Sequence, residues 1–257
     1  MPSTPPSDPR FFQATEITTA TYDREANDYA ERNGNQLPFW AERMERFIAM
    51  MEEALEERPI ADLLSLGRPG DDISLEEYLQ FIPALDAGCG PGRDARALAA
   101  QGLPVLAVDI SQGMLDAAGE RTARRLPKGA IRYTLMDLRR LDLPDASVRG
   151  VWCSASLLHV PRKSALRAVA ELARVARSGA PLVFFLKQRK PDDAPETFES
   201  YPGANPDHLT RYYAYYTEDE VKALLTEAGL ELLDLDISQN PSGPTDHHWI
   251  AAVARKG

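Results

Sequence analysis

The sequence predicts an α/β protein with a doubly wound, mostly parallel sheet, and three observations support this prediction. Past residue 81, short apolar runs alternate with longer amphipathic stretches, as in βαβ units. The first of these runs leads into a glycine-rich turn at residues 88–92, and a helical pattern follows at once. Near the C-terminus two strand-like runs follow each other without a helix between them, so we expect them to pair antiparallel.

Length and composition are those of an ordinary globular chain. The protein has 257 residues, of which 44% are apolar and 26% charged, and a single domain is expected. A chain of this length buries roughly 70–75% of its unfolded surface, so it needs no disulfides or structural metal. The two cysteines, Cys89 and Cys153, offer neither a disulfide framework nor a zinc-site spacing, which indicates a reducing compartment.

The charge balance disfavours two classes of partner. Acidic residues number 39 and basic residues 29, for a net charge of −10, so nucleic acid and anionic membrane surfaces are not expected to bind. No run approaches the ~18 apolar residues of a membrane span, and the N-terminus lacks the apolar stretch of a signal peptide. We therefore expect a cytoplasmic protein.

The N-terminal part divides into a tail and a helical cap. Residues 1–12 are proline-rich and are expected to be disordered, ahead of a domain at 13–257. Apolar residues at helical spacing predict two helices split near Asn33, with a loop at 65–75 and a short helical piece before the core. The cap is assigned to 18–80 and the core to 81–257.

Five strands and three helices are predicted in the first part of the core. The predicted strands are 82–87, 104–109, 131–136, 148–154 and 181–187, and the predicted helices are 94–101, 113–124 and 163–177. Ser178-Gly179 is the expected C-cap of the last helix. Further on, Thr217 caps a helix that runs to Ala228, and strands are expected at 230–237 and 249–254.

The glycine turn is a candidate ligand loop. Gly88, Gly90 and Gly92 let the backbone approach a ligand closely, although a tight turn without a ligand is the alternative. A dinucleotide fingerprint would place a glycine at position 93, where this chain has Arg93. Asp86 would repel a pyrophosphate but attract an ammonium or sulfonium group, so the loop favours a cationic nucleoside.

Two more acids follow successive strands. Asp109 can accept both hydroxyls of a ribose; the alternative is a helix cap, for which Ser111 is the better residue. Asp137 can accept from the exocyclic amine of a purine, with Met136 and Leu138 covering its faces, although a lone Asp after a strand is usually a turn residue.

At this point the sequence resembles the class I S-adenosylmethionine-dependent methyltransferases of small-molecule type, in particular the quinone-biosynthesis group. The resemblance covers roughly residues 18–257 and is carried by LDAGCGPGRD at 85–94, VLAVDIS at 105–111, MDL at 136–138 and VWCSASLLHV at 151–160. It implies a Rossmann-like seven-stranded sheet, with the last strand antiparallel beside the fifth. It also implies S-adenosylmethionine as cofactor and S-adenosylhomocysteine as product.

The resemblance further implies which residues hold the cofactor. Asp86, Gly88 and Gly90 would line its methionine end, and Tyr22 and Tyr29 would close over it. The full expected set is Tyr22, Tyr29, Asp86, Gly88, Cys89, Gly90, Gly92, Arg93, Asp109, Ile110, Met114, Met136, Asp137, Leu138 and Ser154. Arg149-Gly150-Val151 and Leu158-His159 depart from many relatives, so the substrate is not implied.

Methyl transfer is an in-line displacement whose leaving group departs neutral, so a base is needed only when the acceptor keeps its proton. His159 follows the fourth strand and is the candidate base; the alternative is a histidine that holds the loop through a backbone hydrogen bond. His247 and His248 are interpreted as edge or packing residues. Phe39 and Trp40 are assigned to the core, and no metal site is expected.

The insert at 188–216 has two interpretations. It could be a lid, in which Tyr213 packs a flat acceptor and Arg211 pairs with an acceptor carboxylate or phosphate. Alternatively it is an extended strand whose tyrosines alternate between core and solvent.

We predict a methyltransferase that acts on an O, N or C atom of a small molecule, as a monomer or homodimer. The alternatives are a non-catalytic, cofactor-binding regulatory partner and an NAD-dependent oxidoreductase.

Overall fold

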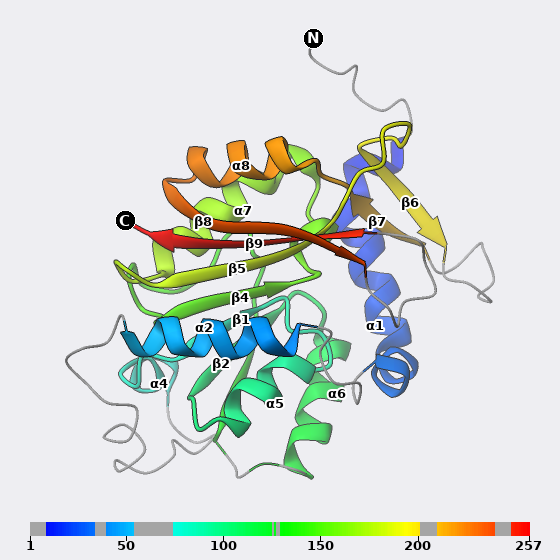
Figure 1. The fold of residues 1–257 in the computed structure, drawn as a ribbon. Coiled ribbons are helices and arrows are strands. Elements are labelled where there is room, and N and C mark those ends of the chain that lie inside the picture. The colour runs from blue at the N-terminus through cyan, green and yellow to red at the C-terminus, as the bar shows by residue number, and fades with distance from the viewer. Residues whose placement is uncertain are drawn as a thin grey trace.

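The computed structural model describes residues 9–33, 40–53, 74–124, 126, 129–200, 210–239 and 248–257. A seven-stranded sheet runs through the molecule (Figure 1) in the order β3-β2-β1-β4-β5-β9-β8. In that order the strands are Ile131–Leu135, Val105–Asp109, Ala84–Ala87, Gly150–Ser154, Pro181–Lys187, His248–Lys256 and Leu230–Gln239. Strands β1 to β5 are parallel, and β9 is antiparallel to both of its neighbours. The predicted fold class is confirmed, with the last strand inserted beside the fifth.

Helices cover both faces of this sheet because successive strand residues point to opposite sides. On one face Leu85, Val151 and Phe184 pack with α7 and α8; on the other Trp152 and Phe185 pack with α2 and α5. The helices are α1 (Ala14–Asn33), α2 (Ala41–Glu53), α4 (Leu75–Leu79), α5 (Arg93–Ala100), α6 (Gln112–Ala123), α7 (Arg162–Val175) and α8 (Glu218–Glu227). Short 3-10 turns lie at η1 (Pro9–Gln13) and η2 (Leu157–His159).

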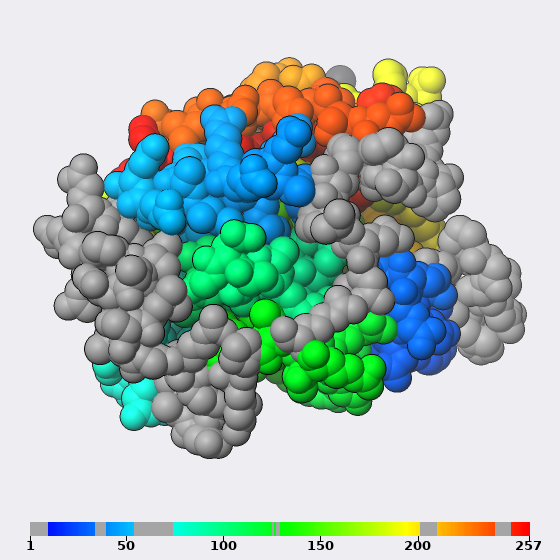
Figure 2. All heavy atoms as spheres, turned by 60° about the horizontal axis from the view of Figure 1, so that its bottom comes forward, coloured from blue at the N-terminus to red at the C-terminus, as the bar shows by residue number. Residues whose placement is uncertain are grey.

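Helix α2 is held along the sheet edge by charge as well as by packing. Figure 2 shows α2 lying between β8 and α5. Arg43 pairs with Asp236 and Arg46 pairs with Asp234, two strand residues that share one face of β8.

Among the helices that the structure describes, none combines the length and apolar character that a membrane span requires.

Most predicted elements are present, with shifted ends. The two N-terminal helices are confirmed, as Ala14–Asn33 and Ala41–Glu53, and the residues that follow Asn33 in the predicted split lie outside the described part of the chain. The predicted C-cap at Ser178-Gly179 is wrong, because α7 ends at Val175: Ala176 takes an extended conformation and bridges to Val148. Gly179, with φ of 78°, instead forms the turn into β5.

The insert after β5 forms a second, two-stranded antiparallel sheet of β6 (Glu196–Ser200) and β7 (Thr210–Ala214). The extended-strand interpretation describes these residues, but the expected alternation of tyrosines between core and solvent is wrong. Tyr212, Tyr213, Tyr215 and Tyr216 are all buried. The reason is that neighbouring rings cover both sides of β7: Phe11 and Phe198 pack against Tyr212, and His159 packs against Tyr213.

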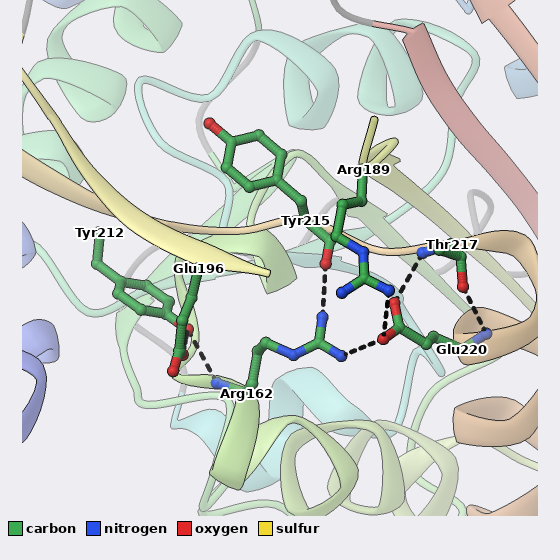
Figure 3. A network of polar contacts seen from close by, with 7 residues as sticks. All are labelled: Arg162, Arg189, Glu196, Tyr212, Tyr215, Thr217 and Glu220. Atoms are coloured by element: carbon green, nitrogen blue, oxygen red, sulfur yellow. Dashed lines mark hydrogen bonds and ion pairs between the residues drawn. The ribbon is translucent and has the colours of Figure 1, made fainter. Parts of the chain in front are cut away.

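The insert is tied to the core by the polar network of Figure 3. The backbone N–H of Arg162, at the start of α7, donates to the Tyr212 hydroxyl at 3.0 Å. The Arg162 guanidinium donates to the Tyr215 carbonyl and, at 2.8 Å, to Glu220. Glu220 also forms the capping box of α8 with Thr217. These bonds fix β7 against α7 and α8.

A buried arginine supports the turn into β1. Arg149 is 1% exposed and donates to the carbonyls of Phe81, at 2.9 Å, and of Ile82. Ile82 has φ of 49°, a conformation that β-branched residues rarely adopt. Burial lowers the pKa of Arg149 to about 10. Arg149 therefore holds a strained turn in place.

We expect Arg149→Ala to lower the free energy of unfolding by about 2–4 kcal/mol, because it leaves two carbonyls without their donor and opens a cavity. Urea unfolding measures this loss. Arg177→Ala is the matched control: its guanidinium also donates to a carbonyl, that of Ala146, but at an exposed position, so a change within about 0.5 kcal/mol is expected. Equal losses in the two variants would contradict this role of Arg149.

Candidate active site

A pocket lies at the carboxyl ends of β1 to β4, where ligands bind in doubly wound sheets, and α1 covers it. It brings together most of the predicted residues: Tyr22, Tyr29, Asp86, Gly88, Cys89, Gly90, Arg93, Asp109, Ile110, Met114, Met136, Asp137, Leu138, Ser154 and His159. Gly92, Arg211 and Tyr213 do not line it. Among the residues that sequence reasoning missed on the pocket wall are Thr18, Asp94, Arg139 and Ser156.

The glycine turn between β1 and α5 has no room for side chains at two positions. Gly88 has φ of 76°, and a Cβ there would lie 2.2 Å from the Cβ of Ser156. Gly92 has φ of 72° and is the N-cap of α5, where a Cβ would meet the Tyr133 hydroxyl at 2.4 Å. Gly92 thus shapes the turn from outside the pocket, whereas Gly88 and Gly90 form part of the wall.

Asp94 is a buried carboxylate whose partners are all protein groups. It accepts from the indole N–H of Trp40 at 3.2 Å and of Trp152 at 3.0 Å, and from Arg93 at 2.8 Å. Burial opposes ionisation, but Arg93 and the indoles outweigh it and lower the pKa of Asp94. The sequence indicated only a helix start here, because both indoles come from distant segments.

Asp86, next to Asp94, is buried with one carboxylate oxygen unsatisfied in the described part of the chain, although the backbone of Ala95 hydrogen-bonds to it. It is 2% exposed, and within the described residues its Oδ2 has no hydrogen-bond partner. Burial, and then the charge of Asp94, raise the pKa of Asp86 well above its usual range. The Ser154 hydroxyl on the neighbouring strand β4 is also buried without a partner in that part of the chain. These two atoms fit a ligand that brings a cationic hydrogen-bond donor.

Asp109 is oriented by the backbone around it. Its two oxygens accept from the N–H of Gly90 at 2.8 Å and of Ser111 at 2.9 Å, and burial raises its pKa against these bonds. Ser111 itself caps α6 by accepting from the Met114 N–H, so the prediction that Ser111 is the cap is confirmed. Each carboxylate oxygen of Asp109 keeps lone pairs for a further donor, such as a ribose hydroxyl.

Asp137 is both a turn residue and part of the pocket wall. The Nε of Arg139 lies 3.0 and 2.9 Å from its two oxygens, and the Arg139 backbone N–H donates at 2.8 Å. Burial opposes ionisation, but these bonds lower the pKa of Asp137. Met136 and Leu138 flank it and are each 8% exposed. Asp137 therefore stays ionised and lies between two apolar surfaces.

Helix α1 covers the pocket from the side. Asp23 accepts from the Ser111 hydroxyl at 2.6 Å and the Gly113 N–H at 3.0 Å, which docks α1 on the start of α6. Tyr22 and Tyr29 meet edge to face with ring centres 5.6 Å apart. The structure thus brings both tyrosines to the place where the sequence expects them to cover a ligand.

His159 has a defined tautomer. Its Nδ1 lies 2.7 Å from the Tyr212 carbonyl, which can only accept, so Nδ1 carries the proton. Its Nε2, 2.8 Å from the Tyr22 hydroxyl, therefore accepts from that hydroxyl. Burial and the charges of Arg211 and Lys187 lower the pKa of His159 to about 3 despite the Tyr212 carbonyl. The backbone hydrogen bond that one interpretation predicted is present.

Arg211 and Tyr213 lie behind this histidine, in β7. Nη1 of Arg211 is 3.3 Å from the Tyr22 hydroxyl, and the Tyr213 ring is centred 4.7 Å from that of His159. Lys187, which sequence reasoning missed, ends β5 with its Nζ 3.9 Å from the centre of the Tyr213 ring. The only feature of the sequence that could have identified Lys187 is its position, as a charged residue at the end of an apolar strand.

Within the described residues no group of three or more His, Cys, Asp or Glu could hold a metal ion.

Comparisons with known proteins agree with this geometry. Residues 84–179 match the family model of the methyltransferase domain. The O-methyltransferase cnsE of Penicillium expansum is 28% identical over 183 residues, 66% of this chain and 62% of that protein. The S-adenosyl-L-methionine-dependent Diels-Alderase iccD of Talaromyces variabilis is 33% identical over 170 residues, 61% of this chain and 56% of that protein. The chain spans less than two thirds of the length of either relative.

Among solved structures, the 1,6-didemethyltoxoflavin-N1-methyltransferase of Burkholderia thailandensis has the same fold. It was crystallised with 1,6-didemethyltoxoflavin and S-adenosylhomocysteine, and it matches with a TM-score of 0.62 at 22% identity over 99% of this chain and 92% of that one. The sheet order, the domain match and this likeness agree with one another. Residues 84–179 thus match a methyltransferase domain, and the chain as a whole has the fold of the Burkholderia enzyme.

Proposed function

We propose that the protein transfers a methyl group from S-adenosylmethionine to an O, N or C atom of a small-molecule acceptor. The observation that carries this proposal is the row of carboxylates Asp86, Asp109 and Asp137 at the ends of β1, β2 and β3, in one pocket. The Oδ2 of Asp86, buried without a partner among the described residues, supports a cationic ligand.

In this proposal each of the three carboxylates binds a different part of the cofactor. Asp86 holds the ammonium of the methionine part, Asp109 the two ribose hydroxyls, and Asp137 the adenine amine. Met136, Leu138 and Ile110 cover the faces of the adenine. When bound, the cofactor supplies an electrophilic methyl group on a sulfonium, and the protein orients the acceptor in line with it and excludes water.

The Talaromyces relative is named an S-adenosyl-L-methionine-dependent Diels-Alderase, which supports a second candidate: a protein that binds this cofactor for a purpose other than methyl transfer. The two candidates are separated by incubating the protein with S-adenosylmethionine and a panel of acceptors. Release of S-adenosylhomocysteine together with a methylated acceptor supports transfer; tight binding without release across the panel supports the second candidate. Parallel calorimetric titrations with NAD test the oxidoreductase alternative.

We also propose a cytoplasmic location, in keeping with the free, buried state of Cys89 and Cys153, and a monomer or homodimer.

Asp109→Asn is expected to weaken binding of S-adenosylhomocysteine about 10- to 100-fold, which corresponds to the ~1.5–3 kcal/mol of hydrogen bonds to a charged group. An amide cannot accept from Gly90, Ser111 and the ribose as the carboxylate does. Isothermal titration calorimetry measures the change. Asp116→Asn, at an exposed carboxylate of α6 that is hydrogen-bonded to Gln112, is the matched control and should bind as wild type. Equal affinities of the two variants would argue against the ribose contact.

The affinity for S-adenosylhomocysteine should rise with pH and then level off. Because the pKa of Asp86 in the free protein is raised, its carboxylate is protonated first as the pH falls, and the protonated form no longer attracts an ammonium. Asp86→Asn should bind more weakly and lose this dependence between pH 5 and pH 8 in calorimetry. Asp145→Asn, at an exposed carboxylate, should keep it. An unchanged profile in Asp86→Asn would place the cationic group elsewhere.

A further inference from the structure

The acceptor end of the pocket is built around the Tyr22 hydroxyl. Tyr22 and His159 line the pocket, and the hydroxyl lies between two nitrogens. It accepts from Nη1 of Arg211 at 3.3 Å and donates to Nε2 of His159 at 2.8 Å. The Tyr212 carbonyl in turn fixes the His159 ring, and Arg162 and Glu220 anchor β7 to the core. The hydroxyl is thus held in position from both sides.

The charges that face this hydroxyl are mainly positive. Arg211 on β7 is 8% exposed, and Lys187 on β5 is 7% exposed. The described carboxylate that faces them is Glu199 on β6, which lies 3.3 Å from Lys187 and accepts from Tyr215. Among the described residues, tyrosines also face this group, including Tyr29 on α1 and Tyr213 on β7, which are neutral when protonated. Two cations and one carboxylate leave the wall with a positive potential.

The pKa values of Tyr22 and His159, the two polar groups on this wall, agree with a positive potential. Burial raises the pKa of Tyr22 well above its usual value, and burial with Arg211 and Lys187 lowers the pKa of His159 to about 3. Near neutral pH the phenol keeps its proton and the imidazole does not take one. Neither group removes a proton from an alcohol, so the wall suits an acceptor that reacts without losing one.

We propose, on the basis of the methyl-transfer function above, that the acceptor is bound and methylated as an oxyanion, either a carboxylate or an acidic phenolate, attracted to the Tyr22 wall by the charges of Arg211 and Lys187 behind it. A neutral amine also reacts without a base, but its product is a cation, which Arg211 and Lys187 repel. An oxyanion is attracted by the same charges, and its methylated product is neutral, so the wall does not repel it.

The step balances without a proton transfer. An acceptor oxygen forms a bond to the methyl carbon with its own electron pair, while the carbon–sulfur bond breaks and its electron pair goes to sulfur. The negative oxygen and the positive sulfur both become neutral, and the product is a methyl ester or an aryl methyl ether. His159 keeps its Nδ1 proton throughout and acts as a positioning residue for the Tyr22 hydroxyl.

The first test does not need the natural acceptor. The full-length protein, labelled with ¹⁵N-histidine, is saturated with S-adenosylhomocysteine and titrated by NMR, with the His159 signals assigned by their absence in His159→Gln. We expect the imidazole to remain neutral and protonated on Nδ1 from pH 8 down to pH 5. Titration between pH 6 and pH 7 would make His159 a competent base and would overturn the proposal.

The second test compares probes of one size and different charge. Benzoate, benzamide and benzylamine are titrated into the same complex by calorimetry, and we expect benzoate to bind at least about 10-fold more tightly than the other two. Arg211→Gln should reduce this preference about 10-fold, whereas Arg255→Gln, at an exposed ion pair with Glu231, should keep it. A benzoate that binds no better than benzamide, or a preference for benzylamine, would overturn the proposal.

Loading with S-adenosylhomocysteine separates this inference from the proposed function. If the protein does not bind S-adenosylhomocysteine in the calorimetric titration, the methyl-transfer proposal itself has failed. If it binds S-adenosylhomocysteine and shows no preference for benzoate, methyl transfer stands and only the oxyanion acceptor is rejected.

Discussion

The withdrawal of two neighbouring carboxylates from water is the constraint around which this fold is arranged. Asp94 and Asp86 are both nearly inaccessible, and burying an ionised carboxylate costs several kcal/mol unless donors replace the lost water. Asp94 receives such donors from Trp40, Trp152 and Arg93, so it links the N-terminal region, β4 and the glycine turn. The Oδ2 of Asp86 has no hydrogen-bond partner among the described residues, so ionised Asp86 is destabilised by its loss of water. A cationic ligand would stabilise it.

The elements and the cofactor side of the pocket could be predicted from the sequence for one physical reason. Parallel strands joined by helices place all their carboxyl ends at one edge, so residues at the ends of successive strands meet in space even when they are far apart in the chain. Asp86 and Asp109 needed only the strand pattern to be placed together. The antiparallel C-terminal pair followed in the same way from the missing helix between β8 and β9.

The acceptor side could not be predicted, because its contacts join segments that no local pattern relates. The Tyr22 hydroxyl meets Arg211 across 189 residues of sequence and His159 across 137. The tyrosines of β7 were expected to alternate in exposure, yet Phe11 and Phe198 pack against Tyr212 and His159 packs against Tyr213, so both are buried. The hydrogen-bond partners of Asp94 and of Arg149 could likewise not be predicted. The hydrophobic periodicity of the sequence indicates which face of an element is buried, but it does not indicate which polar groups pair there.

Helix α1 connects the two ends of the site. Through Asp23 it is hydrogen-bonded to Ser111 and Gly113, beside the residue that would hold the ribose, and through Tyr22 it reaches His159 and Arg211. Thr18 and Thr21 bond the same helix to the backbone of β7. A ligand that orders α1 against Ser111 therefore also orders the Tyr22 hydroxyl at the other end. Binding of the cofactor would in this way prepare the wall that receives the acceptor, with the positive charges of β5 and β7 already in place behind it.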